Sequence, residues 1–480
     1  MSLIALLVLP LLAAALCWLL RNHRLAPALT FATSLAVLAL AFRVALNVAR
    51  GSSVIAFHNV VAADGLSALV VLLVALVGAT GALYSWGYMA KTAHDPRKLR
   101  LYYANYNLFI FAMMGIPLVL EPTLVWILVE LTTLSSALLV SFEDTHEALE
   151  AAWKYVALSL MGAAIALLGF LVLFSAMEAA GGGTFTWDGL LAAAPQMPPK
   201  LLQTAFLLIL VGFGTKVGLV PMHTWLPDAH SQAPSPVCAL LSGIETTTVL
   251  YVILRLLPVL KAVPVPNIEL WAVAFGLVSV GTAALLLLQV RDYKRLFAYS
   301  TVEHMGIVLL SAGLASPAAH YGAIYQVLSH TVTKSFCFFA AGAVLLTVGT
   351  REIASVRGLL RSSPVAAAGL LLGGLAIAGA PPFAVFLSEF SIIKAGLAEG
   401  QYLTIALLVL FIAIGFFGIM QHINRMVFGA PQPEASTPAV LPVSCVAALS
   451  MAGALVVALG IHLPGPLHEL LRFASATLQG

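Results

Sequence analysis

Charge is the scarcest feature of this 480-residue chain. Lys and Arg number 23, Asp and Glu number 20, and together they make 9% of the residues, against about 25% in a typical soluble domain. A chain of this length needs more charge than that to cover a surface exposed to water, so the composition excludes a soluble enzyme. Because 61% of the residues are hydrophobic, it excludes intrinsic disorder as well.

Two further absences argue against nucleic-acid binding and cofactor ligation. The net charge is only +3, and the chain has no basic tract of the kind that follows phosphates. The four cysteines stand singly in apolar runs, with no CxxC pair, which argues against iron–sulfur clusters, zinc sites and a disulfide framework. We therefore expect no cofactor and no metal in this chain, and we expect any associated redox chemistry to belong to another polypeptide.

No polar linker long enough to separate domains interrupts the chain, so we expect residues 1–480 to form a single membrane domain. A helix needs about 20 apolar residues to cross the hydrocarbon core, and about fourteen such stretches occur. The expected fold class is therefore an all-α polytopic membrane protein. The predicted spans are 3–20, 27–47, 66–86, 102–120, 123–141, 155–177, 202–221, 237–258, 268–289, 297–314, 321–346, 364–396, 403–424 and 441–461.

Basic residues next to the spans predict the orientation of the chain. When Arg21 and Arg24 are placed in the cytoplasm and the chain alternates through fourteen spans, the cytoplasmic loops hold fourteen Lys and Arg residues, the opposite loops hold six, and three fall within spans. This bias predicts that both termini lie on the periplasmic side of a bacterial inner (cytoplasmic) membrane. Removing one span would reverse every later loop and destroy the bias.

Ionisable residues occur inside the predicted spans, where an unpaired and unhydrated charge is costly and usually functional. The residues are Glu130 in the fifth span, Lys216 in the seventh, Glu245 in the eighth, Glu303 and His304 in the tenth, His330 and Lys334 in the eleventh, and Glu389 in the twelfth. A row of acids, lysines and histidines at membrane depth is what proton relay requires. The alternative is that some of them are ion pairs that lock helices together.

Prolines interrupt two of the spans. Pro221 follows Lys216 by five residues, and Pro381 and Pro382 break the twelfth span just before Glu389. When spans 4–8 and 9–13 are taken as two five-helix units, the broken helix is the fourth in each, which is typical of inverted repeats whose interrupted helices line an ion site. The alternative is that the prolines only kink packed helices.

These repeats divide the single domain into four stretches: N-terminal spans in 1–100, a first half-channel in 101–262, a second half-channel in 263–430 and a C-terminal span in 431–480. We also expect the Pro381–Pro382 break to expose backbone carbonyls to water. Glu389 lies about 10 Å beyond the break along a helix. We therefore expect it to reach a hydrated outlet on the periplasmic side.

Polar residues near the predicted loops allow two interpretations. His223 and His230 either take up protons, because an unperturbed histidine has a pKa of about 6.5, or cap the helix that follows. Asp228 is interpreted as a turn or cap residue, and the charged run that includes Lys294 as a topological anchor. The acidic loop is interpreted as a solvated face first and as a partner contact second; its residues are Glu143, Asp144, Glu147 and Glu150.

Two runs of sequence resemble a known family. KVGLVPMHTWLPDAH (216–230) and DYKRLFAYSTVEHMG (292–306) are similar to signatures of the antiporter-like membrane subunits of respiratory complex I. The resemblance covers about residues 60–430. Four shorter runs look most like the hydrogenase-4 component F branch, found in formate-hydrogenlyase-type complexes: ELTTLSS (130–136), LEAAWKY (149–155), STVEH (300–304) and PPFAVFLSEF (381–390).

The resemblance implies roles for individual positions. Glu130 and Lys216 match the fifth- and seventh-helix pair of the family. His330 and Lys334 match the positions of the central relay, and Glu389 matches the exit residue of the twelfth helix. One position departs, because many relatives carry a lysine in the eighth span where this chain has Thr247. Glu245 lies two residues earlier, about 200° around a regular helix, so it does not simply replace that lysine.

The implied function is that of a proton-translocating subunit in a membrane-bound hydrogenase-4-type or NADH-quinone-oxidoreductase-like complex. Such a subunit performs no redox step itself. Its expected partners are other membrane subunits, a soluble redox arm, the lipid bilayer, and protons or monovalent cations. Two alternatives remain open: a subunit of a redox-independent cation/proton antiporter or inorganic-carbon uptake complex, and a membrane anchor that conducts no protons.

Overall fold

A computed structural model of the chain describes residues 2–19, 24–52, 54–57, 60–430 and 440–479, so Arg21 lies outside the described residues. The described chain is mostly helical because a segment in lipid must satisfy its backbone N–H and C=O groups internally, and a helix does so. The first helices are α1 Ser2–Leu19, α2 Leu25–Ala49, α3 Gly65–Thr92, α4 Pro96–Leu118, α5 Pro122–Val140, α6 His146–Ala179, α7 Trp187–Ala193, α8 Pro199–Val217, α9 Trp225–Gln232, α10 Ser235–Leu240 and α11 Thr246–Lys261.

The remaining helices are α12 Ile268–Leu287, α13 Tyr293–Ala312, α14 Pro317–Val348, α15 Leu359–Ser362, α16 Pro364–Ile377, α17 Ala384–Ala398, α18 Tyr402–Phe428, α19 Val443–Ile461 and α20 Gly465–Ala476. Short 3-10 turns are η1 Ser141–Glu143, η2 Ala194–Gln196, η3 Met222–Thr224 and η5 Ile353–Ser355, and η4 Leu241–Glu245 is a π-helical turn. The strands are β1 Val54–Ala56 and β2 Val61–Ala63.

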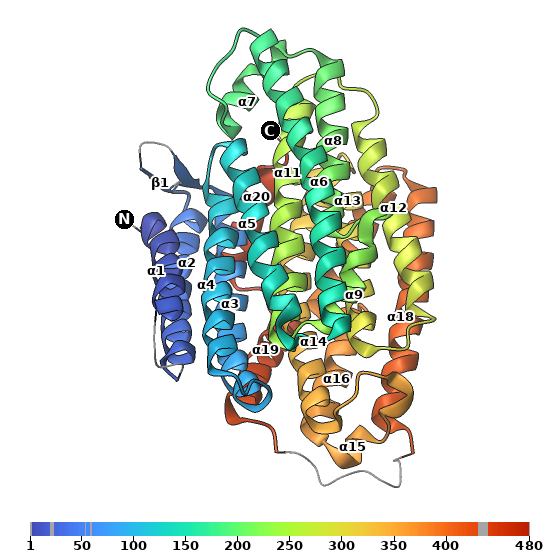
Figure 1. Cartoon of the computed structure of the whole chain (residues 1–480). Helices are drawn as coiled ribbons and strands as arrows, with labels where there is room; N and C mark the ends of the chain where they lie inside the picture. Colours follow the sequence, from blue (N-terminus) through green and yellow to red (C-terminus); the bar gives the residue numbers. More distant parts are fainter. Residues whose placement is uncertain (1, 20–23, 53, 58–59, 431–439, 480) are drawn as a thin grey trace.

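The expected count of fourteen spans is confirmed. Eleven helical segments in the described chain are long and apolar enough to cross a membrane. Three further spans complete the set: α4 with 23 residues, α13 with 20 residues, and the pair α16 and α17 with 14 and 15 residues. Figure 1 shows these helices running up and down side by side, with α7 at the upper end and α15 at the lower end.

Both expected helix breaks are present. The seventh span consists of α8, which ends at Val217, and α9, with Pro221 between the two helices. The twelfth span consists of α16 and α17, with Pro381 and Pro382 between them. Each break contains a glycine with positive φ, Gly218 at +87° and Gly379 at +76°, a conformation that glycine adopts without steric cost. The broken helices are fourth in the two five-helix units, as the sequence pattern predicts.

Small residues let the helices of each unit approach closely. A Cβ added to Gly162 of α6 would lie 2.5 Å from the carbonyl oxygen of Gly212 on α8, and one added to Gly276 of α12 would lie 2.6 Å from that of Gly306 on α13. Such contacts are typical of helix pairs in membranes, where packing has to act without a strong hydrophobic drive. They fix the position of α8, which carries Lys216, and of α13, which carries Glu303 and His304.

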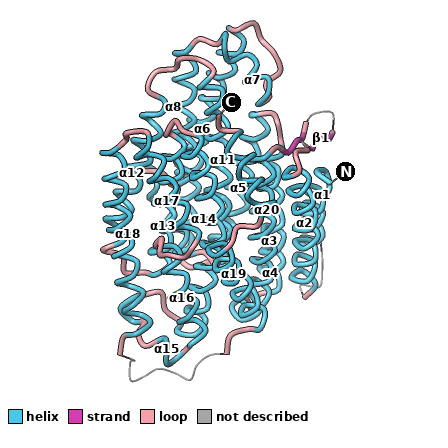
Figure 2. The backbone as a smooth tube through the Cα atoms, turned by 180° about the vertical axis from the view of Figure 1, so that it is seen from behind, coloured by secondary structure: helices cyan, strands magenta, loops and turns pink. Residues whose placement is uncertain are grey.

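Two elements were not expected from the sequence. The strands β1 and β2 form a short antiparallel hairpin. Helix α20 packs against α3, where a Cβ on Gly65 would lie 2.5 Å from the backbone of Phe473. Figure 2 shows α20 beside α3 from behind. The 12-residue α20 is too short to span a membrane, so it adds to the bundle without changing the span count.

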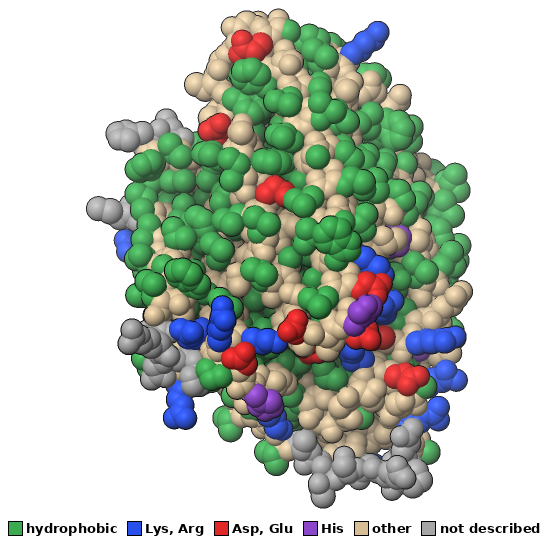
Figure 3. Space-filling model, viewed as in Figure 1, with side chains coloured by type: hydrophobic (Ala, Val, Ile, Leu, Met, Phe, Trp, Pro, Cys, Tyr) green, Lys and Arg blue, Asp and Glu red, His purple; other side chains and the backbone are tan. Residues whose placement is uncertain are grey.

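Charged side chains gather at one end of the bundle, which we call the charged end. It is formed by the loops around residues 92–96, 141–146, 288–293 and 348–364. Figure 3 shows Lys, Arg, Asp and Glu side chains concentrated toward the lower part of the molecule, beneath a mainly apolar band. Helix caps define several of these boundaries; Asp292, for example, accepts hydrogen bonds from the N–H groups of Lys294 at 2.7 Å and Arg295 at 3.2 Å.

Candidate functional site

The candidate relay residues lie inside the bundle, and most are fully buried. Lys216, Glu245, Glu303, His304, His330, Lys334 and Glu389 are each at most 6% exposed, His230 is wholly buried and His223 is 9% exposed. Glu130 is the exception, because its side chain is half-buried, although its Oε1 atom is enclosed. The structure arranges these residues in three groups.

The first group surrounds Lys216. The structure corrects the expected pairing, because the Lys216 ammonium forms its ion pair with Glu245 at 3.2 Å and none with Glu130. Glu245 is wholly buried at the end of the π-helical turn η4. It faces Lys216, whereas Thr247, two residues later, faces Thr331 on α14, so the two side chains point in different directions, as their separation around a regular helix predicts. The first five-helix unit therefore has an acid–lysine pair, but with a different acid.

The surroundings of this pair are polar in a way that the sequence did not reveal. Lys216 also donates to the carbonyl of Val129 at 3.2 Å and to the hydroxyl of Thr133 at 2.5 Å. Tyr155 donates its phenolic proton to Glu245 at 2.9 Å. The one signal for Tyr155 was its place in a run that resembles the family. A tyrosine in an apolar span is too common to single out.

Glu130 lies next to this group on α5. Its Oε1 atom and the Oε2 atom of Glu245 are buried and have no hydrogen-bond partner in the protein. Lys216 bonds to the carbonyl of Val129 and the hydroxyl of Thr133 on α5, and the Glu130 carboxylate lies within electrostatic reach of both Lys216 and Glu245. Each carboxylate offers an unused lone pair to a proton.

The second group is a pair of histidines in the middle of the bundle. The Nε2 atom of His330 lies 3.1 Å from the carbonyl oxygen of Ser242, and the Nε2 atom of His304 lies 3.0 Å from the carbonyl oxygen of Ile377. A carbonyl only accepts, so both Nε2 atoms carry the proton and both Nδ1 atoms carry a lone pair. The Nδ1 of His304 accepts from Gln326 at 3.0 Å, whereas the Nδ1 of His330 is buried without a partner.

The break in the twelfth span supplies one of these contacts. Ile377 is the last residue of α16, so its carbonyl has no intrahelical partner. It accepts the His304 proton instead, and the ring of His304 lies 5.2 Å from the ring of His330, centroid to centroid. The helix interruption thus orients a titratable ring.

Lys334 is buried without an acid. Its ammonium donates to the carbonyl of Phe297 and to the hydroxyl of Ser300, both at 2.5 Å, and no carboxylate lies within ion-pair distance among the described residues. His330 and Lys334 lie on one helix, as their spacing predicts, but they contact different neighbours, because His330 faces η4 and Lys334 faces α13.

The third group joins two acids on either side of α14. Glu389 packs its carboxylate against Gly379 in the helix break, and Glu303 packs its carboxylate against Gly415 on α18. The two acids lie within electrostatic reach of each other. Ser388, the neighbour of Glu389, donates to Gln326, which in turn bonds to His304. The third group is therefore connected to the second by side-chain hydrogen bonds.

Glu389 is buried in this conformation, and its outlet stays a prediction. Its side chain is 6% exposed, and its carboxylate turns back toward the break. Pro381 and Pro382 of the break are exposed. The next turns of α17 pack in a separate apolar cluster, formed by Val280, Ile307, Leu310, Leu314, Ala319, Ile392, Ala395, Ile405 and Leu408.

The turn η4 bridges the first and second groups. Glu245 at its end bonds to Lys216, and the carbonyl of Ser242 in the same turn accepts from His330. Thr247, which stands where many relatives have a lysine, lies 3.4 Å from Thr331 on α14. The two five-helix units therefore meet through a π-turn and hydroxyl groups.

The residues after Pro221 lie toward the charged end. Asp228 forms ion pairs with Arg295 at 2.6 Å and Lys154 at 3.2 Å, so it ties α9 to α13 and α6. His230 lies 2.7 Å from the carbonyl of Leu226 through Nδ1, and its Nε2 is buried without a partner. In the described part of the chain, no three His, Cys, Asp or Glu residues are placed to hold a metal ion.

Comparisons with known proteins agree with this architecture. The family model described as "NADH:quinone oxidoreductase/Mrp antiporter, TM" matches residues 120–415, and the one described as "NADH-Ubiquinone oxidoreductase (complex I), chain 5 N-terminus" matches residues 54–102. The chain is similar to the hydrogenase-4 component F homolog of Methylacidiphilum infernorum (isolate V4), with 39% identity over 382 residues, which cover 78% of this chain and 80% of that protein.

Two solved structures share the fold. A chain of the membrane-bound sulfane sulfur reductase, an archaeal respiratory membrane complex, superposes with a TM-score of 0.90 at 24% identity, covering 99% of this chain and 98% of that one. A chain of the Mrp complex from Dietzia sp. DQ12-45-1b superposes with a TM-score of 0.89 at 22% identity, covering 100% and 97%. The expected fold class and the family resemblance are confirmed.

Proposed function

Because this chain belongs to the NADH:quinone oxidoreductase/Mrp antiporter family of membrane subunits, we propose that it translocates protons as part of a multisubunit membrane complex. One observation carries the proposal: buried titratable groups follow one another from Lys216 to Glu389 through the helix bundle, with the half-buried Glu130 at one end. Burying so many ionisable groups in a membrane protein is expensive, and proton pathways are a principal reason to do so.

In the first half-channel the moving part is the Lys216–Glu245 pair. While the ammonium and the carboxylate lie 3.2 Å apart, each stabilises the charged form of the other. Separation would leave both charges in a medium of low dielectric, where the neutral forms are favoured. Lys216 then releases its proton, and the free oxygen of Glu245 or Glu130 accepts one.

The middle of the pathway passes through η4 to the histidines. His330 takes up a proton on its unpartnered Nδ1 and releases it again from the same atom, while its Nε2–H stays bonded to the Ser242 carbonyl. Lys334 holds a second transferable proton on the same helix. Beyond them, Gln326 and Ser388 connect His304 to the region of Glu389 and Glu303. Release past Glu389 requires the apolar cluster to open.

The assembly and orientation follow from the same proposal. The charged end faces the cytoplasm of a bacterial inner membrane, by the positive-inside rule, and both termini face the periplasm. Other membrane subunits of a hydrogenase-4-type complex adjoin the chain, and a soluble redox arm supplies the driving reaction. In this assignment the chain itself carries no cofactor. The translocated ion is a proton, because His330 and His304 bind protons and are poor sites for hydrated sodium.

The test is proton translocation by the assembled complex in membrane vesicles, measured together with its redox turnover. Lys216→Ala should abolish translocation, while Lys200→Ala, at the exposed start of α8, should leave it unchanged. Partner subunits that co-purify with the chain identify the redox arm. Normal assembly and a wild-type translocation rate in Lys216→Ala would contradict the proposal and favour a membrane anchor.

A further inference from the structure

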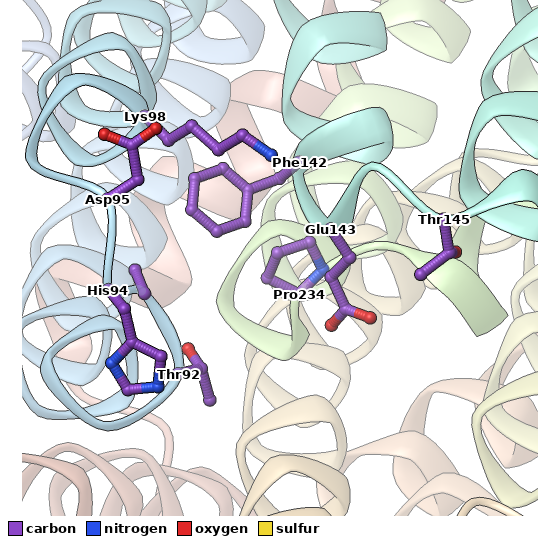
Figure 4. A pocket seen from close by; sticks show the side chains of 9 residues that line it. Thr92, His94, Asp95, Lys98, Phe142, Glu143, Thr145 and Pro234 are labelled. Carbon is purple, nitrogen blue, oxygen red and sulfur yellow. The ribbon is translucent and has the colours of Figure 1, made fainter.

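Two cavities adjoin each other at the charged end of the bundle. One has a volume of about 440 Å³ and lies between the end of α3, the start of α4 and the turn η1. The other has a volume of about 390 Å³ and reaches toward α13 and the end of α14. Thr92 and Glu143 line both. In Figure 4, Glu143 and Pro234 face Thr92 and His94 across the opening of the first cavity.

The second cavity ends on a buried charge. Lys294 lines it, yet the side chain is only 1% exposed. The Lys294 ammonium donates to the carbonyl of Ser231 at 3.1 Å and to the carbonyl of Ala233 at 2.5 Å, and no acid of the described chain forms an ion pair with it. An ammonium has three protons, so one remains beyond these two bonds. A topological anchor would point its charge outward, but this lysine points inward.

The residue next to this lysine leads to the centre of the protein. Ser231, which accepts from Lys294, directly follows His230. The proton on His230 must be on Nδ1, because Nδ1 faces the carbonyl of Leu226. Its Nε2 therefore carries a lone pair, buried and without a partner. Both Lys294, which lines the second cavity, and Lys334 lie within electrostatic reach of this ring.

We propose that the two cavities form the proton-uptake site of the charged end, with Glu143 as the residue that collects protons at their mouth. The proposal rests on the proposed function and adds its uptake site. A hydronium ion gives its proton to the Glu143 carboxylate, and the carboxyl passes it to water in the second cavity, which ends at Lys294. The next titratable group toward the relay is His230, one residue from the Ser231 carbonyl that Lys294 contacts.

Glu143 differs from the other acids of its loop. Asp144 is held by Lys98 at 3.0 Å, and Glu150 is held by Lys154 at 2.7 Å, both on the exposed surface. Neither lines a cavity. The charged and titratable groups that line the cavities with Glu143 are His94, Asp95 and Lys98 in the first, and Tyr88, Lys294 and Arg351 in the second. Glu143 is the one carboxylate that lines both cavities.

The first experiment compares two neighbouring acids in the assembled complex. Glu143→Gln should lower proton translocation per electron transferred several-fold, because the collecting carboxylate is lost. Asp144→Asn is the matched control and should translocate as the wild type does. Equal translocation by Glu143→Gln and the wild type would overturn the uptake role.

The second experiment blocks the cavity. The four native cysteines are buried, so a membrane-impermeant thiol reagent should modify Thr92→Cys selectively when added from the cytoplasmic side. Modification should stop proton translocation, while modification of Asp144→Cys should leave it unchanged. Protection of Thr92→Cys in the assembled complex would overturn the proposal, because a partner subunit would then fill the cavity.

A third variant separates this proposal from the proposed function. Lys334→Ala removes a central relay group far from the cavity. If it stops translocation while Glu143→Gln and modified Thr92→Cys do not, the uptake site is wrong and the relay stands. If Lys334→Ala also translocates normally, the proposed function itself fails.

Discussion

Replacing Glu245 by Gln removes the charge that neutralises Lys216 in the first half-channel. The two side chains are 0% and 3% exposed, so solvent does little to screen the loss. Removing one partner of a buried ion pair typically costs about 3–5 kcal/mol. We expect the lower end of that range, because the glutamine amide keeps the shape and can still accept from Tyr155, which now donates to Glu245 at 2.9 Å.

The assay has two parts. Thermal unfolding of the complex in detergent measures stability, and proton flux in vesicles measures translocation. Glu245→Gln should lower both. Glu130→Gln is the control for stability, because Glu130 is half-buried and forms no ion pair, so its unfolding temperature should change little. If Glu130→Gln destabilises the protein and Glu245→Gln does not, the assignment of the pair is wrong.

A double variant separates the two effects. Lys216→Met combined with Glu245→Leu replaces the whole pair by apolar side chains, and such replacements are often neutral or stabilising. The double variant should therefore unfold near the wild-type temperature yet translocate no protons. Recovery of translocation along with stability would show that the pair only holds helices together.

Two further predictions concern other parts of the chain. Gly415→Ala places a methyl group where the Glu303 carboxylate lies and should reduce proton flux. The control is Gly465→Ala, which should not reduce the flux, because a Cβ added there meets nothing within 4 Å. Equal flux in both variants would remove Glu303 from the relay. Burial alone would raise the pKa of Asp64, but the Arg255 guanidinium at 2.5 Å and the hydrogen bonds from Ser67 together outweigh it and hold that pKa below the ordinary value of 3.8. The stability from this pair is therefore complete above pH 3.8 and is lost as the pH falls below it. Acidification should lower the unfolding temperature of the wild type more than that of Asp64→Asn. Parallel curves of unfolding temperature against pH for the two proteins would contradict the assignment.

Span number and helix breaks could be predicted because their signals are local. A run of about 20 apolar residues is sufficient to indicate a span. Pro221, Pro381 and Pro382 each remove a backbone hydrogen-bond donor within a span, which indicates a kink or a break. Helix α20 could not be recognised in the same way. Its 12 residues are fewer than a span needs, and it is held by packing against α3.

The partner of Lys216 could not be predicted because the contact depends on how the helices pack. Glu245 faces Lys216 from η4, and nothing in the sequence of the spans indicates which acid, Glu130 or Glu245, lies within ion-pair distance. The pairing with Glu130 came from the family resemblance, which indicates a functional position but not a contact. The packing beyond Glu389 could not be predicted for a related reason, because the apolar cluster there combines residues from five helices.

The most direct test of the continuous relay is the number of protons translocated per electron in His330→Leu. Leucine fills the space of the ring but cannot hold a proton, and His330 lies where η4 joins the two half-channels. The matched control is His422→Leu. His422 is also buried and lies 3.2 Å from the backbone carbonyl of Leu287, but it is not one of the candidate relay residues. We expect His330→Leu to lose translocation and His422→Leu to keep the wild-type ratio. A wild-type ratio in His330→Leu would contradict the continuous pathway.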